Sequence, residues 1–332
     1  MKRICKSLFI AGLMACASVG AFAQGKLTLD DINIRDPFIV PVAEEGVYYM
    51  YSSSSVKENG AVYGGVMAYK SKDLKHWDAP VRVFDVPRDN YLTGVVWAPE
   101  VHKYNGKYYL FATLNSDIKW KGSWKGHPVF THRSTQIFWS DKPEGPFQAF
   151  ENKLPHTPIG EMCLDGTLWV ENGVPYMIYC HEWVEVMDGE MKIVRLKEDL
   201  SEPVGQPIRL FCASAASWST GSGNEDPKLR TYVTDGCFLY RTKADKLLMI
   251  WSSFKNGSYA LGIAESATGK VLGPWKQQEN LIFEADGGHG MIFRSFEGKL
   301  YIVLHSPNSP GGAERAKLFE LEDLGHTLQL KK

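Results

Sequence analysis

The sequence has few cysteines and no C-x-x-C pair. Of the six cysteines in 332 residues, two fall within the first 23 residues, which leaves Cys163, Cys180, Cys212 and Cys237. A zinc site is therefore not expected. Four cysteines permit three disulfide pairings, and their spacing does not choose between these pairings and free thiols.

The sequence also lacks an excess of positive charge. It contains 37 Lys and Arg against 38 Asp and Glu, a formal net charge of -1. Residues 1–23 hold three of the positive charges and no negative one, so the remainder carries a formal charge of -4. A surface for polyanions needs clustered basic residues, and we therefore expect no nucleic acid partner.

After residue 23 no stretch approaches the roughly 18 apolar residues of a transmembrane helix. Residues 8–22 are apolar, follow a basic start and end in Ala21-Phe22-Ala23, which is the pattern of a cleavable export signal. We predict that residues 1–23 are a signal peptide and that 24–332 form one domain, exported to the periplasm or the medium. Lipid anchoring through Cys16 is the less favoured alternative, because Met14 fits a lipoprotein signal poorly.

Little of the chain has the spacing of amphipathic helices. Instead, five similar units recur, each with a polar or acidic residue beside Gly or Pro, then a strand-like run, a turn and a second strand. The stretches between these hairpins also resemble one another and supply two more strands each. The lead residues are spaced by 64, 65, 70 and 54 positions and are Asp36, Glu100, Asp165, Asp235 and His289. We predict an all-β fold, a five-bladed β-propeller with four-stranded antiparallel blades.

A propeller would bring these lead residues together, because the innermost strand of every blade lines the central channel. Gathered carboxylates raise one another's pKa, so such a group favours metal binding or acid–base chemistry. Two carboxylates with pKa values pushed apart are what glycosidic cleavage requires. We interpret the acidic lead residues as the source of a catalytic set.

Aromatic side chains near the inner strands would offer platforms for sugar rings. We predict that substrate contacts Trp97, Trp183 and Trp251, together with Glu100 and Glu182, although blade packing is an alternative role for each tryptophan. Two polar inserts, 117–133 and 212–230, carry Trp120, Trp124 and Trp218. Such loops could close the channel into a pocket and make an enzyme exo-acting.

The lead residues resemble glycoside hydrolase family 43, and the resemblance extends from Asp31 to about Leu321. Arg35-Asp36-Pro37 is similar to the general base of that family, Trp97-Ala98-Pro99-Glu100 to its second-blade motif, Leu164-Asp165-Gly166 to its pKa-modulating Asp and Gly288-His289-Gly290 to its fifth-blade His. The resemblance implies an inverting glycosidase in which Asp36 deprotonates water, Asp165 tunes the acid and Asp235 protonates the leaving group. It also implies a calcium or sodium ion near His289, with no cofactor required for the chemistry.

The fourth unit departs from the family pattern. The family usually has Glu before this Gly, whereas this sequence has Asp235-Gly236. Aspartate is one methylene shorter, so either the substrate lies deeper or the proton comes from another residue. Glu182, within Cys180-His181-Glu182-Trp183, is the substitute candidate, and Glu225 is a weaker one.

We expect a monomer, and the resemblance implies that it acts on oligo- or polysaccharides of plants. Terminal α-L-arabinofuranosyl units come first, and β-xylosyl, β-galactosyl and galactofuranosyl units are alternatives. A sugar-binding propeller without catalysis also stays open, because the fourth unit departs from the pattern. A retaining enzyme like the fructan-cleaving family 32 also carries Arg-Asp-Pro, but in the middle of its propeller, whereas here the triplet comes first.

Overall fold

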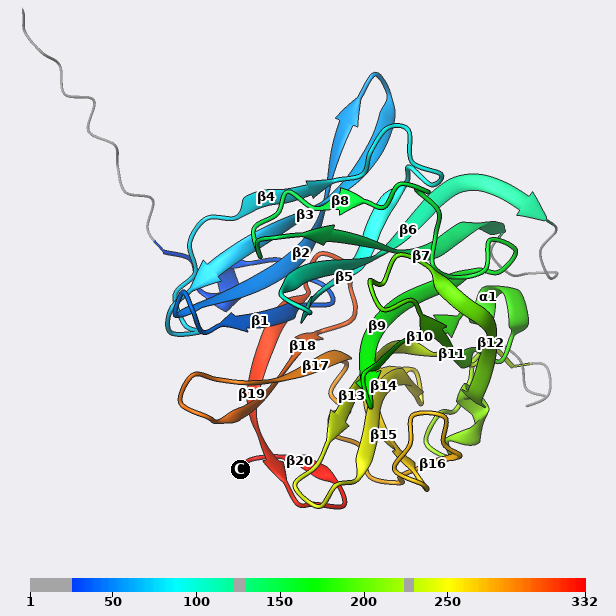
Figure 1. Cartoon of the computed structure of the whole chain (residues 1–332). Helices are drawn as coiled ribbons and strands as arrows, with labels where there is room; N and C mark the ends of the chain where they lie inside the picture. Colours follow the sequence, from blue (N-terminus) through cyan, green and yellow to red (C-terminus); the bar gives the residue numbers. More distant parts are fainter. Residues whose placement is uncertain (1–25, 122–128, 224–229) are drawn as a thin grey trace, which may run out of the picture.

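Five antiparallel sheets of four strands each surround a common centre, and the chain is a five-bladed β-propeller (Figure 1). The structure, a computed structural model, describes residues 26–121, 129–223 and 230–332. The predicted signal peptide, Trp124 and Glu225 lie outside the described residues, as does the side chain of Trp120. The predicted fold class and blade number are confirmed.

The blades follow one another along the chain, and each is built from consecutive strands that run from the inside outward. In order they are β1 (Phe38–Val42), β2 (Val47–Glu58), β3 (Ala61–Ser71) and β4 (Val81–Asp85); β5 (Val95–Tyr104), β6 (Lys107–Lys121), β7 (Phe130–Ser140) and β8 (Gln148–Ala149); β9 (Cys163–Glu171), β10 (Val174–His181), β11 (Glu190–Leu196) and β12 (Pro203–Cys212); β13 (Asp235–Arg241), β14 (Leu247–Lys255), β15 (Ser258–Ser266) and β16 (Trp275–Gln277); and β17 (Gly288–Arg294), β18 (Leu300–Ser306), β19 (Arg315–Asp323) and β20 (Leu328–Leu330). The helical elements of the described chain are η1 (Leu29–Asp31), α1 (Trp183–Val186) and η2 (Ala213–Ala215).

The innermost strands form a closed ring. Each contacts the innermost strand of the next blade, and β17 of the last blade contacts both β13 and β1. Residues at the start of these strands therefore meet although they lie far apart in the sequence.

Asn-Gly pairs close four of the hairpins. The pairs stand between β2 and β3, β5 and β6, β9 and β10, and β14 and β15, and both residues of every pair have positive φ, from 45° to 86°. Two-residue turns of this kind match the twist of antiparallel strands, and Asn and Gly adopt positive φ most readily. These turns fix the register that decides which side chains face the core.

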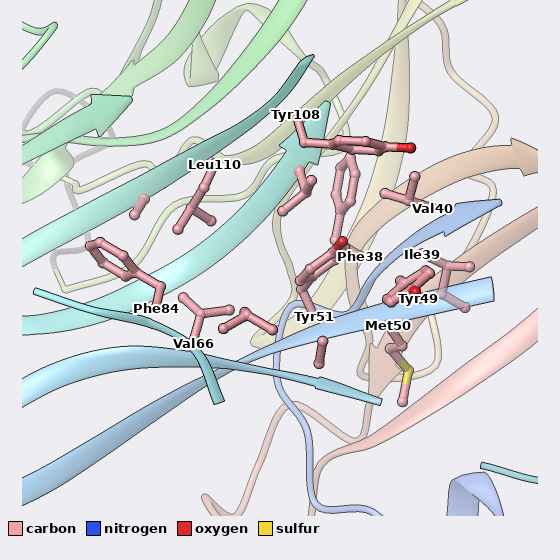
Figure 2. Packing of buried hydrophobic residues seen from close by; sticks show 14 of the residues in the cluster. Phe38, Ile39, Val40, Tyr49, Met50, Tyr51, Val66, Phe84, Tyr108 and Leu110 are labelled. Carbon is pink, nitrogen blue, oxygen red and sulfur yellow. The ribbon is translucent and has the colours of Figure 1, made fainter. Parts of the chain in front are cut away.

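Aromatic residues fill the space between the first two blades. Figure 2 shows Tyr49 and Tyr51 packed with Phe38, Tyr108 and Leu110, and the first two are 0% exposed. The Tyr51 hydroxyl donates to the carbonyl of Pro143 at 2.7 Å, so its polar end is satisfied inside the core. Each such ring stabilises the fold by roughly 1.5–3 kcal/mol through burial.

Within the described residues, no helix has the length and apolar character needed to cross a membrane. The four cysteines after residue 23 are free thiols in this structure.

Candidate active site

A β-bulge opens the innermost strand of blades two to five. Across the bulge, the inner strand advances by three residues while the neighbouring strand advances by two. The second bulge residue always has a left-handed backbone, with φ of 40° at Ala98, 55° at Asp165, 49° at Gly236 and 50° at His289. Asp36, just before β1, has φ of 52°. Because a bulge changes the direction of a side chain, this repeated feature directs these side chains toward one another.

The bulges correct two predicted equivalences. The prediction that Glu100 and Asp235 stand in the same position as Asp36 is wrong, because Ala98 and Gly236 occupy that position. Asp235 is the first residue of its bulge and still reaches the centre. Glu100, in contrast, lies two residues after Ala98 in β5. Glu100 is 4% exposed, and its carboxylate lies 2.8 Å from Nε2 of His102. It does not line the central cavity.

The central cavity has a volume of about 420 Å³ and brings together most of the predicted site residues. Its lining consists of Arg35, Asp36, Ser53, Trp97, Leu164, Asp165, Glu182, Trp183, Val233, Thr234 and Asp235. Trp251, which we predicted to contact substrate, is instead 0% exposed and packs against Trp218. Substrate cannot reach a fully buried ring, so Trp251 belongs to the core of blade four.

His289 lies among Asp36, Asp165 and Asp235, which we call the central acids. Its Nδ1 is 3.1 Å from Asp36 Oδ1, 3.7 Å from Asp235 Oδ1 and 3.9 Å from Asp165 Oδ2. Burial lowers the pKa of His289, but the three carboxylates raise it well above its ordinary value. The contacts are ion pairs rather than aligned hydrogen bonds, since Nδ1 has no hydrogen-bond partner of good geometry. His289 therefore supplies a positive charge to the acids.

Asp36 is held in its ionised form. Burial raises its pKa, yet His289 and His305 together lower the pKa well below its usual range. His305, on β18, is 0% exposed, and its Nδ1 lies 3.2 Å from Asp36 Oδ1. An ionised carboxylate in a cavity is suited to accept a proton from water.

Asp165 and Asp235 form a coupled pair. Each offers an oxygen within 4.8 Å of the other and of His289 Nδ1. Burial raises the pKa of Asp165, and the nearby charge of Asp235 raises it further, to well above its ordinary value. A carboxyl group beside another carboxylate ionises less readily, so Asp165 tends to keep its proton. The side chain of Asp235 is 21% exposed against 2% for Asp165, and Asp235 is therefore the member open to the cavity.

Tyr259 fixes the other oxygen of Asp235. Its hydroxyl donates to Asp235 Oδ2 at 2.5 Å, and its ring stacks on His305 at 5.5 Å between centroids. Burial raises the pKa of Tyr259 well above its ordinary value, so the hydroxyl keeps its proton and remains a donor. Tyr259 lies near the start of β15 and His305 near the end of β18, outside the repeated motif that marks the innermost strands. Sequence reasoning missed both.

Glu182 reaches the cavity from the short segment before α1. It forms an ion pair with Arg133 of β7. Burial raises the pKa of Glu182, and the guanidinium of Arg133 opposes that effect. Trp183 is half-buried beside it and also lines the cavity. The structure thus brings together two of the predicted aromatic residues, Trp97 and Trp183, with the substitute acid candidate.

The centre fits a resident calcium ion poorly. Asp165, Asp235 and His289 offer three ligand atoms within 4.8 Å of one another. Calcium takes about six to eight oxygen ligands, and histidine ligates metals only when neutral. This group offers two carboxylates and a cationic imidazole, so we derive no chemical step through a metal here.

A five-bladed propeller whose centre holds one carboxylate of lowered pKa and one carboxyl group of raised pKa defines a class: β-propeller hydrolases that act by acid–base chemistry. The profile described as glycosyl hydrolases family 43 matches residues 31–323. The chain belongs to that family and is a glycosidase. The predicted family is confirmed.

Solved structures agree with this assignment. An endo-arabinase from Bacteroides thetaiotaomicron VPI-5482 is 37% identical, with a TM-score of 0.77, and the match covers 90% of this chain and 98% of that chain. A thermostable family-43 glycoside hydrolase is 23% identical with a TM-score of 0.73, covering 90% and 93%. An endo-1,4-beta-xylanase from Bacteroides thetaiotaomicron VPI-5482 is 21% identical with a TM-score of 0.69, covering 92% and 97%. A search of curated proteins gives no significant match.

Proposed function

We propose that this glycosidase hydrolyses plant polysaccharides by inversion and releases terminal α-L-arabinofuranosyl units or the related β-xylosyl, β-galactosyl or galactofuranosyl units. The observation that carries the proposal is the arrangement of the central acids around His289, in which His289 and His305 lower the pKa of Asp36 while burial and Asp235 raise the pKa of Asp165. The 37% identity to an endo-arabinase supports an arabinose-containing substrate.

In the proposed mechanism Asp36 accepts a proton from water as the water oxygen attacks the anomeric carbon. The bond from that carbon to the leaving oxygen breaks, and Asp235 gives this oxygen a proton that the neighbouring Asp165 supplies. His289 stabilises the ionised Asp36 and, after the transfer, the second negative charge of the pair. Nitrophenyl glycosides of the four sugars, with arabinan and arabinogalactan, identify the substrate, and no turnover on any of them would contradict the proposal.

The spacing of the acids bears on the stereochemistry. Asp36 Oδ1 and Asp235 Oδ1 lie 3.1 Å and 3.7 Å from the same nitrogen, so their separation is at most the sum of these distances, 6.8 Å. Inverting enzymes place their carboxyl groups about 6.5–9.5 Å apart, and retaining enzymes about 5–5.5 Å. The limit applies to one pair of oxygens and contains the retaining range as well as the lower end of the inverting range, so the product decides whether the enzyme inverts. NMR of the first-formed product anomer tests it, and a retained anomer would favour the family 32-like alternative.

Variants separate the two candidate acids. Asp36→Asn should abolish turnover of every substrate. Asp235→Asn should abolish turnover of polysaccharide but spare nitrophenyl glycosides, whose leaving group needs little protonation. If Glu182→Gln instead lost kcat on polysaccharide with KM unchanged, and nitrophenyl glycosides were spared, Glu182 would be the acid. If sugar bound without turnover and Asp36→Asn changed nothing, the protein would be a non-catalytic sugar-binding propeller.

Exo action and export complete the proposal. The inserts that would close a pocket include undescribed residues, and the 37% identical relative is named an endo-arabinase, so the length of the first products from arabinan decides between the two modes. Export of a monomer, with residues 1–23 removed, is checked by the mass and the N-terminus of the secreted protein. A calcium or sodium ion near His289 stays a prediction, and an unchanged melting temperature on chelation and calcium titration would contradict it.

A further inference from the structure

Arg133 joins two walls of the central cavity. It is 8% exposed and donates from Nε to Asn115 Oδ1 at 2.7 Å. Its Nη1 donates to Glu182 Oε2, and its guanidinium carbon lies 4.2 Å from the ring centroid of Trp97. One buried side chain thus fixes an aromatic ring of blade two and a carboxylate of blade three. Such a rigid fork is a property of arginine that lysine does not share.

Glu182 keeps one oxygen open to ligand. Oε2 is bound by Arg133, and among the described residues no donor bonds Oε1. The backbone is also fixed, because Glu182 N donates to the carbonyl of Met162 at 2.8 Å and Met162 N donates to Glu185 Oε2 at 2.7 Å. A carboxylate held this way accepts a hydrogen bond from a hydroxyl group without having to be ordered first.

Trp97 presents the matching apolar surface. It is 37% exposed and lines the cavity, and the guanidinium of Arg133 covers one face of its ring. The exposed part of the ring therefore lies on the side away from Arg133. An aromatic surface beside a hydrogen-bond acceptor suits a sugar ring, which has C–H groups on its face and hydroxyls at its edge.

The charges indicate which sugar would bind. Arg133 and Glu182 neutralise each other, so this wall favours an uncharged sugar unit over a uronic acid. Glu182 directly follows β10 of blade three, Asp235 begins β13 of blade four, which contacts β10, and both residues line the central cavity. Since Asp235 faces the leaving oxygen in the proposed mechanism, Glu182 borders the sugar unit on the leaving-group side.

We propose that Glu182 and Trp97 bind the neutral sugar unit that leaves, and that Arg133 is the residue that positions both. The inference rests on the proposed function. It concerns recognition of the leaving group, whereas the central acids perform the chemistry.

The test compares an arabino-oligosaccharide with nitrophenyl α-L-arabinofuranoside, which share the first sugar and differ in the leaving group. Glu182→Gln and Arg133→Met should each lower kcat/KM for the oligosaccharide by about 10- to 100-fold, mainly through KM, because a hydrogen bond to a charged group is lost. The nitrophenyl substrate should change by less than about threefold. Arg133→Lys should restore only part of the activity. The matched control is Glu202→Gln, an exposed glutamate paired with Lys197.

Several outcomes would overturn the inference. Equal losses on both substrates would mean that Glu182 acts on chemistry or folding, and a loss in kcat alone on the oligosaccharide would make it the acid. The double variant Arg133→Met with Glu182→Gln should have a kcat/KM for the oligosaccharide no lower than that of the poorer single variant. Additive losses would contradict positioning by Arg133. If the wild type cleaves neither substrate, the proposed function fails. Calorimetric binding of the oligosaccharide to Asp36→Asn, with and without Glu182→Gln, then decides the binding role alone.

Discussion

Replacing His289 by asparagine should show how much of the centre depends on one positive charge. Asparagine tolerates the φ of 50° at this position. At an effective dielectric constant of about 20, unit charges separated by the 3.1 Å between His289 and Asp36 attract by about 5 kcal/mol. Desolvation of the imidazolium opposes part of this, and removal of one partner from a buried ion pair costs about 3–5 kcal/mol. That is a large share of the roughly 5–15 kcal/mol that stabilises a domain.

The pH dependence gives the sign of the effect. The lowered pKa of Asp36 stabilises the fold above the unfolded pKa, and this contribution is lost as pH falls through the folded pKa. The raised pKa of His289 stabilises the fold below the unfolded pKa, and that contribution is lost as pH rises through the folded pKa. The variant should therefore lose stability across neutral pH. The acid limb of kcat/KM should also move up by roughly two to four pH units, since Asp36 protonates more readily.

Two measurements check this prediction. Chemical unfolding at pH 7 should show the loss of about 3–5 kcal/mol, and the pH profile of kcat/KM on a nitrophenyl glycoside should show the moved limb. The matched control is His326→Asn, at an exposed position, which should alter neither. An unmoved acid limb together with a stability loss below about 1 kcal/mol would refute the ion-pair account.

Three further predictions concern the fold around the site. Gly236→Ala should lower the free energy of unfolding by about 2–4 kcal/mol, because the added Cβ would lie 2.5 Å from Cγ of His289. Gly298→Ala, with open space around it, should lower it by only about 1 kcal/mol. Equal losses in chemical unfolding would count against the close contact. His181→Gln should lower the free energy of unfolding most at low pH. Burial lowers the pKa of His181 but two glutamates raise it above its ordinary value, so the stabilisation is present below the unfolded pKa and is lost as pH rises through the folded pKa. A difference in unfolding free energy that stays constant with pH would contradict this. Trp251→Ala should cost about 3–5 kcal/mol and act on stability rather than KM, as expected of a buried core residue; a rise in KM without destabilisation would return Trp251 to the substrate site.

The fold was predictable because its signals are local and repeated. A polar residue beside Gly or Pro marks the entry of each inner strand, and Asn-Gly pairs such as Asn105-Gly106 mark the hairpin turns. Since each unit has the same order of strands, errors at single positions do not change the number of blades. The repetition therefore made the architecture predictable, even though the predicted and observed strand boundaries differ by a few residues.

The residues that hold the acids of the cavity in place were not predictable from such signals. Arg133, Tyr259 and His305 lie on β7, β15 and β18, outside the innermost strands, and their importance comes from what the closed ring places beside them. Sequence spacing also cannot show which residue takes the second bulge position of an inner strand, and in blade two this residue is Ala98 rather than Glu100. That is why Glu100 stood in the predicted set, although it is buried beside His102.

The position of Asp235 follows from the room available at the centre. The second bulge position of blade four is a glycine, because the ring of His289 occupies the space that a side chain there would need. Blade four must therefore supply its carboxylate from the preceding residue, and Tyr259 holds that carboxylate by a hydrogen bond of 2.5 Å. A short side chain suits this arrangement, since Asp235 has to reach Tyr259, Asp165 and the cavity at once. The aspartate that departs from the family pattern is thus consistent with an acid, provided that the leaving oxygen approaches as deep as Asp235 lies.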